Sequence, residues 1–181
     1  MAIVLVVFAA LIGSACGKSP TAPSPNGSNP ATPPAVSATT TRLSFTSDPA
    51  SAVGQGQSRT YTLQNATFQP LIGHAGGYVS VVVRSTDPSD SSQWSAVMMM
   101  PLGRVLSPGT YSAGEVSFEA PMFNFSGGGR ACGSGTTASF TIHEVAVSGE
   151  TLQRLRTSFT VHCGGSAKVS GHIVILADPW R

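Results

Sequence analysis

The sequence predicts an all-β fold, a single antiparallel β-sandwich of about eight strands, and three observations support this prediction. Thr, Ser, Gly and Val are abundant, whereas the helix-favouring Lys, Glu and Leu are sparse. Several segments alternate apolar and polar side chains with the two-residue period of a half-buried strand. Turn-forming Gly, Pro and Asp residues separate these segments. Short alternating strands with such turns between them are typical of an antiparallel sandwich.

The alternation is clearest in residues 155–163, where Leu155, Phe159 and Val161 share one face and polar side chains share the other. The same period predicts strands at 78–84, 115–120 and 138–147, with shorter candidates at 43–46, 59–63, 94–100, 109–113 and 172–176. Within residues 138–147 the apolar phase shifts near His143, so one extra residue is needed there. The simplest such irregularity is a β-bulge.

The first fifteen residues are typical of an export signal. Residues 2–12 form an uncharged apolar run that ends in small residues and is shorter than the roughly twenty residues that span a bilayer. Placed directly before Cys16, this segment is similar to the lipobox of bacterial lipoproteins, in which the cysteine is acylated and becomes the mature N-terminus. We therefore expect residues 1–15 to be a signal peptide and a lipid on Cys16 to hold the protein at a membrane. Gly13 stands where a lipobox usually has Leu, and ordinary cleavage with free secretion is the alternative.

A linker is predicted to follow. Residues 17–41 are nearly all Pro, Ser, Thr, Ala, Asn and Gly, without an aromatic side chain, so they cannot bury enough apolar surface to offset the entropy lost on ordering. A Pro-rich segment is extended, which would hold a folded domain clear of the membrane. We expect residues 16–41 to be anchor and linker and 42–181 to be the sandwich domain. The protein would then belong to the bacterial cell envelope, as an outer-membrane or cell-surface lipoprotein.

The three cysteines divide into one and two. Lipidation of Cys16 leaves Cys132 and Cys163 as an even pair in an exported protein. A hairpin is predicted around residues 148–151, and its antiparallel pairing would set Cys163 opposite Thr136. We therefore expect a Cys132–Cys163 disulfide at the open end of this hairpin. A zinc site is the alternative, although the sequence has no C-x-x-C or H-x-H spacing to support it.

Most of residues 42–176 resembles a group of uncharacterised bacterial secreted proteins and lipoproteins. The resemblance is carried by short motifs in order, which are LSFTSDP at 43–49, GQGQ at 54–57, LSPGTY at 106–111, GRAC at 129–132, SFTI at 139–142 and FTVHC at 159–163. Proteins of this group have a small β-sandwich with a paired cysteine near a Gly-Arg and a His-Cys. The resemblance thus implies the fold, export and the disulfide, and it implies no activity.

Charge argues against nucleic acid as a partner. Charged residues make up 10% of the chain, with ten basic against eight acidic side chains and a formal net charge of +2. The eight arginines and two lysines are scattered rather than gathered in a stripe. The phosphate contacts that dominate nucleic-acid affinity are therefore not expected.

No familiar catalytic motif is complete. The string at 164–168 lacks the last Gly of a nucleophile elbow, and His143-Glu144 lacks the second histidine of a zinc protease. The Gly-rich run at 127–135 has no following Lys-Ser/Thr to hold a phosphate. Glu115 and Glu119 share a strand face as a glycosidase pair would, but glutamates on a wet strand face are ordinarily solvated. The sequence therefore predicts neither a metal nor a cofactor.

Three residues are candidates for binding. His162 is placed on the polar face beside the expected disulfide, Arg130 belongs to the GRAC motif, and Trp94 could stack on a sugar, with core packing as the alternative. We expect a non-catalytic, surface-displayed domain that binds a protein or glycan partner or has a structural role in the envelope. The alternatives are an extracellular hydrolase of envelope polymers or polysaccharide, and an assembly factor or inhibitor of another exported protein.

Overall fold

The computed structural model describes residues 40–114 and 119–177 of the 181 in the chain. These residues belong to one compact unit, Ser37–Arg181. In the two described ranges every regular element is a β-strand except one short 3-10 turn, η1 (His74–Gly76). No helix in this part of the chain is both long and apolar enough to span a membrane. The ten strands found there are β1 (Arg42–Ser47), β2 (Ser58–Thr62), β3 (Ala66–Gly73), β4 (Tyr78–Ser85), β5 (Gln93–Met99), β6 (Gly109–Ala113), β7 (Met122–Gly127), β8 (Thr136–Ser148), β9 (Thr151–Cys163) and β10 (Lys168–Leu176).

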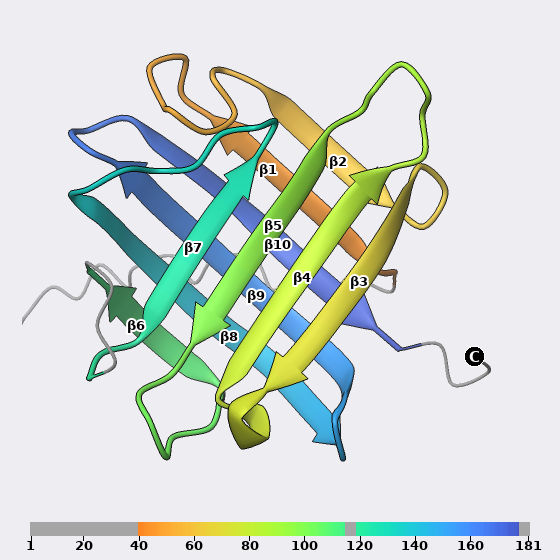
Figure 1. Ribbon diagram of the computed structural model, residues 1–181, viewed down its shortest axis with the longest axis vertical. Helices are drawn as coiled ribbons and strands as arrows, with labels where there is room; N and C mark the ends of the chain where they lie inside the picture. Colours follow the sequence, from red (N-terminus) through yellow and green to blue (C-terminus); the bar gives the residue numbers. More distant parts are fainter. Residues whose placement is uncertain (1–39, 115–118, 178–181) are drawn as a thin grey trace, which may run out of the picture. The chain divides into compact units, whose positions relative to one another are not determined.

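The strands form two antiparallel sheets. One has six strands in the order β2-β1-β10-β9-β8-β6, and the other has four in the order β3-β4-β5-β7. In Figure 1 the four-stranded sheet lies in front, and its strands run across those of the six-stranded sheet behind it. The predicted all-β antiparallel sandwich is therefore confirmed.

The predicted number of strands was too low. Strands β3 and β7 are absent from the sequence prediction, and the described ranges hold ten strands rather than about eight. Pro70 interrupts the strand pattern of β3, which is tolerated because β3 is an edge strand and pairs only with β4. The strand expected at 115–120 cannot be compared, because residues 115–118 lie outside the described residues.

The long β8–β9 hairpin has the predicted register. Thr136 pairs with Cys163, and Ser148 pairs with Thr151 across a two-residue turn. The ladder shifts between Ile142 and Glu144, at the place where the change of apolar phase predicted a bulge. The hairpin therefore follows from local sequence.

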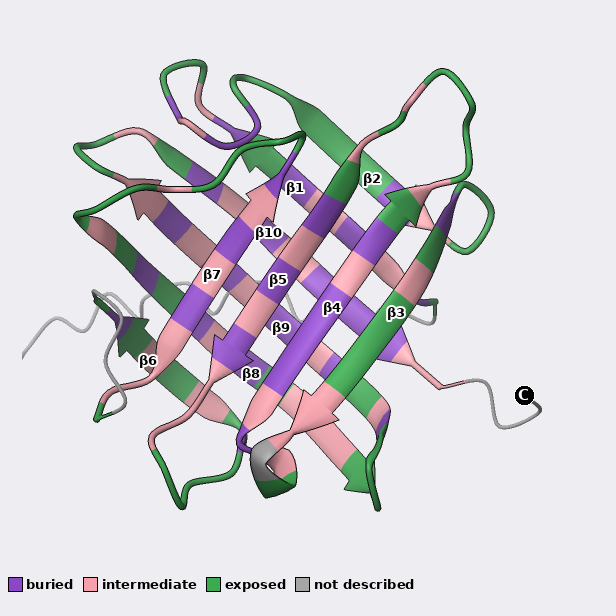
Figure 2. Cartoon of the chain, viewed as in Figure 1, coloured by how far each residue is buried: buried purple, intermediate pink, exposed green. Residues whose placement is uncertain are grey.

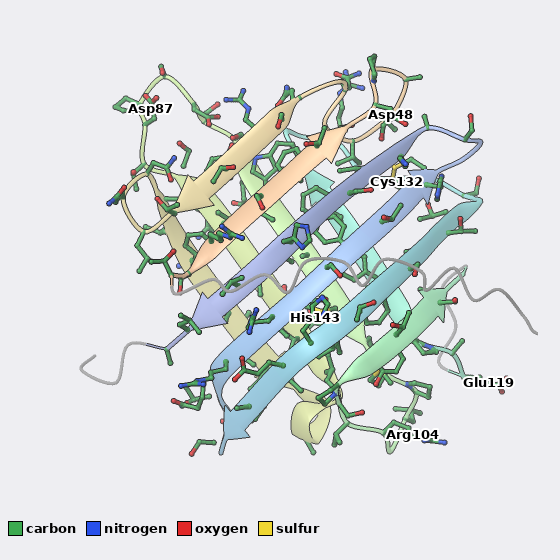
Figure 3. The ribbon with its side chains drawn as sticks, turned by 180° about the vertical axis from the view of Figure 1, so that it is seen from behind. Asp48, Asp87, Arg104, Glu119, Cys132 and His143 are labelled. Atoms are coloured by element: carbon green, nitrogen blue, oxygen red, sulfur yellow. A yellow bond between two sulfur atoms is a disulfide. The ribbon has the colours of Figure 1, made fainter. Side chains whose placement is uncertain are left out.

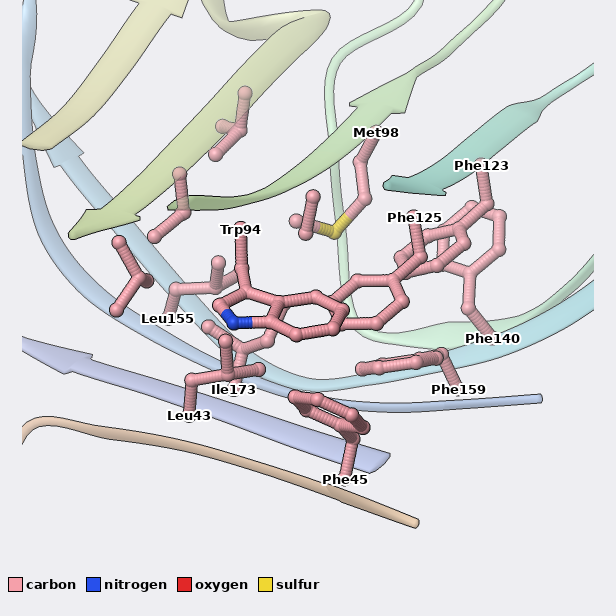
Figure 4. Packing of buried hydrophobic residues seen from close by; sticks show 14 of the residues in the cluster. Leu43, Phe45, Trp94, Met98, Phe123, Phe125, Phe140, Leu155, Phe159 and Ile173 are labelled. Carbon is pink, nitrogen blue, oxygen red and sulfur yellow. The ribbon is translucent and has the colours of Figure 1, made fainter. Parts of the chain in front are cut away.

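Aromatic side chains fill the space between the sheets (Figure 4). The ring of Trp94 from β5 lies 4.3 Å from that of Phe45 in β1 and 5.6 Å from that of Phe125 in β7, measured between centroids. The Phe125 ring is in turn 4.8 Å from that of Phe159 in β9. Burying a large apolar side chain contributes about 1.5–3 kcal/mol, so this cluster is a main source of the domain's stability.

Two glycines make room for the aromatic cluster. A Cβ atom on Gly127 would lie 2.0 Å from Cε3 of Trp94, and one on Gly171 would lie 2.4 Å from the carbonyl oxygen of Ser44. Along most strands of both sheets, for example β1, β5, β7 and β9, buried and more exposed residues alternate (Figure 2). Each sheet thus has one face in the core and one outer face, and the outer faces are where a partner can bind.

Candidate functional site

The outer face of the six-stranded sheet is rich in hydroxyl groups. Successive side chains of a strand point to opposite faces of the sheet. The residues that stand next to a buried residue in the sequence are therefore directed outward. Most of the outward positions in these six strands hold Ser or Thr, and Figure 3 shows the sheet from this side. We call this surface the hydroxyl face, and it contains Ser44, Thr46, Ser58, Thr60, Thr62, Thr110, Ser112, Thr137, Ser139, Thr141, Ser158, Thr160 and Ser170.

Several of these hydroxyls are ordered by hydrogen bonds between neighbouring strands. The bonded pairs are Thr46–Ser58 at 3.2 Å, Thr110–Thr141 at 2.9 Å, Thr160–Ser170 at 2.9 Å and Nε2 of His143 with Oγ of Ser158 at 3.0 Å. A hydroxyl donates one hydrogen bond and can accept two. One bond to a neighbour therefore orients each group and leaves it able to bond a ligand.

Two successive rows of the hydroxyl face cross all six strands without a charged side chain. One row is Thr60–Ser44–His172–Ser158–Thr141–Thr110, and the next is Ser58–Thr46–Ser170–Thr160–Ser139–Ser112. Charged residues lie in the rows on either side. On one side Glu144 pairs with Arg154 at 3.1 Å and with Arg156 at 3.9 Å, and on the other the backbone N–H of Lys168 donates to Oδ2 of Asp48 at 3.0 Å. The central surface is thus polar and neutral.

A hollow of about 430 Å³ lies on this surface where β2, β1 and β10 adjoin. Its size falls in the range of ligand pockets, roughly 300–1,000 Å³. The polar side chains that line it are Ser44, Thr46, Ser58, Arg59, Thr60, Ser170 and His172. Small hydroxyl groups therefore supply most of its polar contacts.

The surroundings of His172 favour its neutral form. Burial lowers the pKa of His172, and electrostatic repulsion from Arg42 and from the neighbouring His143 lowers it further. A neutral imidazole donates one hydrogen bond and accepts one. His172 thus resembles the surrounding hydroxyls in its bonding and brings no charge to the hollow.

The disulfide at the end of the hairpin is confirmed. Cys132 and Cys163 are joined, and the hydroxyl of Ser51 donates to Sγ of Cys163 at 3.9 Å. His162 is half-buried at the end of β9, opposite Thr137. Arg130 is exposed on the turn that follows β7. Within the described residues, neither a hydrogen bond nor an ion pair joins these two candidates.

Trp94 is not available to a ligand. Only 2% of its surface is exposed, and its Nε1 donates to the hydroxyl of Tyr61 at 2.9 Å. Trp94 therefore packs in the core, as the alternative interpretation predicted, and the hypothesis that it stacks on a sugar is wrong. Glu119 is exposed, whereas its expected companion Glu115 and the lipidation candidate Cys16 lie outside the described residues. In the ranges 40–114 and 119–177, no three His, Cys, Asp or Glu side chains gather as metal ligands would.

Comparison with known proteins adds no relative. No family model matches the chain, and neither a curated protein nor a solved structure is detectably similar to it. The geometry of the domain is therefore the basis for the function proposed below.

Proposed function

We propose that this protein is an exported, lipid-anchored, non-catalytic domain of the bacterial cell envelope that binds a neutral glycan on its hydroxyl face. The observation that carries the proposal is the pair of uncharged rows across six strands, with the hollow between β2, β1 and β10. A neutral polysaccharide presents many hydroxyl groups and no charge. It is matched by a surface that offers many donors and acceptors and few charges that binding would desolvate, and in the hollow the one charged side chain is Arg59, which lies 4.0 Å from the carboxylate of Asp90.

The regularity of the sheet suits a repeating polymer. Neighbouring strands lie about 4.8 Å apart, and alternate residues along a strand lie about 6.8 Å apart. The outward hydroxyls consequently form a lattice that several sugar units can contact together. Each hydrogen bond contributes only about 0.5–1.5 kcal/mol, so we expect a short oligosaccharide to bind with a Kd of roughly 0.1–1 mM and a long polymer to be retained more strongly.

Glycan binding is tested with the compact unit Ser37–Arg181. An array and affinity electrophoresis with neutral polysaccharides should identify at least one retained polymer. Ser44→Lys with Thr60→Lys places bulk and charge in the hollow and should weaken retention at least tenfold. The matched control is Ser95→Lys with Ser126→Lys, a cross-strand pair on the outer face of the other sheet, and it should bind as the wild type does. Failure of every neutral polymer, or equal loss in both variants, refutes the proposal.

The anchor is tested separately. A radiolabelled fatty acid should enter the full-length wild type expressed in a bacterium and should not enter Cys16→Ala, because the thiol of Cys16 is the proposed point of attachment. Equal labelling of the two chains would show that the protein is not acylated at this residue. A freely secreted protein would appear in the medium without label.

A further inference from the structure

The outer face of the four-stranded sheet has the opposite chemistry from the hydroxyl face. Val79, Val81 and Val83 of β4 point into the core, so the residues between them point outward. Two adjacent rows of this outer face are Gly73–Tyr78–Met99–Met122 and Leu71–Ser80–Val97–Asn124. Apolar and aromatic side chains therefore gather at the end of the sheet where β5 finishes.

The loop after β5 extends this apolar surface past the end of the sheet (Figure 1). Leu102 and Val105 are 75% and 57% exposed, and Leu102 is the most exposed of the large hydrophobic residues described. We call Leu71, Tyr78, Val97, Met99, Leu102, Val105 and Met122 together the apolar end.

Backbone hydrogen bonds hold this loop at both of its ends. The N–H of Met100 donates to the carbonyl of Gly77 at 2.8 Å, and that of Leu106 donates to the carbonyl of Gly76 at 3.0 Å. Between them, the N–H of Arg104 donates to the carbonyl of Pro101 at 3.0 Å and closes a turn. Leu102 and Val105 are thus presented outward by a loop that is already ordered.

Charge on β5 and the loop that follows it has one sign, and the nearest described acidic residue in the next segment is Glu119, before Met122. Residues 91–114 contain no Asp or Glu, and Arg104 is their only charged residue. Its side chain lies at the end of the molecule that carries the loop, between the two exposed apolar residues in sequence (Figure 3). The other arginine on this outer face, Arg84, is held by hydrogen bonds to Gln69 and Gln93 at the far end of the sheet.

We propose that the apolar end rests on a lipid surface, with Leu102 and Val105 among the acyl chains and Arg104 at the phosphate groups. A protein interface of ordinary stability buries about 800 Å² on each partner and needs a complementary shape, which two side chains on a turn do not supply. A bilayer needs no such shape, and its affinity grows with buried apolar area and with attraction of cations to anionic lipid. A loop with two exposed apolar side chains, one arginine and no acidic residue fits these requirements.

Chain connectivity permits this contact. The Pro-rich residues 17–41 separate Cys16 from β1, and an extended Pro-rich chain advances about 3.1 Å per residue. If Cys16 is acylated as proposed above, a chain of this length would let any side of the domain turn toward the membrane. It would also raise the effective concentration of lipid, so two apolar side chains suffice where they would bind weakly alone. The contact is a property of the folded unit and is measurable without the acyl chain.

The test is co-sedimentation of the unit Ser37–Arg181 with vesicles of phosphatidylethanolamine and phosphatidylglycerol, titrated to millimolar lipid. The wild type should pellet with the vesicles. Leu102→Asp with Val105→Asp should lower the partition coefficient at least tenfold. Arg104→Gln should weaken binding to vesicles with phosphatidylglycerol and leave binding to zwitterionic vesicles unchanged.

Leu63→Asp is the matched control, because Leu63 is 62% exposed and lies on the turn between β2 and β3. It should bind as the wild type does, and all variants should keep the wild-type circular dichroism and thermal transition. A wild type that stays in the supernatant, or equal losses in the control and the double variant, overturns the proposal. A dimer that sedimentation equilibrium detects and the double variant abolishes would assign the apolar end to a second copy instead. Glycan retention should be unchanged in the double variant, which separates this test from that of the hydroxyl face.

Discussion

Trp94 and Gly127 make the closest fit in the core. The two residues pair across β5 and β7, and the ring of Trp94 occupies the volume where a Cβ atom of residue 127 would stand. The ring cannot move aside easily, because Phe45 and Phe125 pack against it and Tyr61 accepts the hydrogen bond from its Nε1. This arrangement explains why the tryptophan belongs to the core.

Gly127→Ala should therefore destabilise the domain by about 1–3 kcal/mol or more, since overpacking a filled core forces side chains out of place. The measurement is the urea midpoint of the unit Ser37–Arg181. Gly133→Ala is the matched control, because a Cβ atom there would have no neighbour within 4 Å. If the two substitutions change the midpoint equally, the fit around Trp94 is not the cause.

His172 makes stability depend on pH. Its pKa is lowered in the folded protein, first by burial and then by electrostatic repulsion from Arg42 and His143. The unfolded chain therefore takes up a proton first as pH falls through about 6.5, the ordinary pKa of histidine, and the folded state loses stability relative to it. Above that pH both states hold a neutral imidazole, and this group adds no pH dependence.

His172→Gln should consequently flatten the decline in unfolding free energy between pH 7 and pH 5. The difference in stability between variant and wild type should be constant above pH 7.5 and should shift in favour of the variant as the solution becomes acidic. Urea titrations at a series of pH values provide the measurement. Curves that stay parallel from pH 7.5 to pH 5 would exclude His172 as the group responsible.

Among the elements, the β8–β9 hairpin is closed by the disulfide at its open end. Cys132 and Cys163 are 31 positions apart in sequence, and the bond shortens the loop available to the unfolded chain. In the chain-entropy account a loop of this length is worth about 3–4 kcal/mol. Cys132→Ser with Cys163→Ser should lower the unfolding free energy by this amount, and the reduced wild type should match the variant. A loss of unfolding free energy below about 1 kcal/mol would contradict the entropic account.

The bond itself is checked by intact mass. The oxidised domain should be two hydrogens lighter than the reduced one.

Local patterns were sufficient for the elements that have a clear period and a clear turn. Alternation in β9, the phase change near His143 and the short turn after Ser148 determine the hairpin and its register without tertiary information. Strand β3 was missed because it contains Pro70, and a proline is tolerated there only because β3 lies at the edge of its sheet. The local sequence does not show whether a strand lies at an edge. Strand β7 ends at the Gly-rich run that begins with Gly127, and in the sequence such a run is typical of a loop. The packing of Trp94 against Gly127 joins β7 to β5, and this contact depends on the tertiary fold.

The candidate site could not be predicted without knowing the order of the strands in the six-stranded sheet. Each strand of the six-stranded sheet has at least one Ser or Thr at an outward position, and this signal was present in the sequence. Which strands are neighbours depends on long-range pairing, such as that of β1 with β10 at the two ends of the domain. Only this order places Ser44, His172 and Ser158 in one row, so the neutral surface was not predictable from the separate segments.

For the domain as a whole, the sandwich places the two unlike outer faces on opposite sides of one aromatic core. The hydroxyl face belongs to the six-stranded sheet and the apolar end to the four-stranded sheet and its loop. A domain that rests on lipid through the second surface consequently presents the first one away from the membrane. Glycan binding on the hydroxyl face and lipid contact at the apolar end can therefore occur together, and each is tested by a separate experiment.

This orientation is open to measurement with a reporter on each side. Leu102→Cys marks the loop of the apolar end and Thr60→Cys the hydroxyl face, and each is labelled with the environment-sensitive dye NBD in the unit Ser37–Arg181, whose own two cysteines are joined. Vesicles should shift the emission at position 102 to shorter wavelength and protect it from an aqueous quencher, because the dye enters the lipid. The emission and quenching at position 60 should not change, because that face stays in water. Equal protection at both positions would mean that the domain has no preferred orientation, and protection at position 60 alone would reverse the assignment of the two faces.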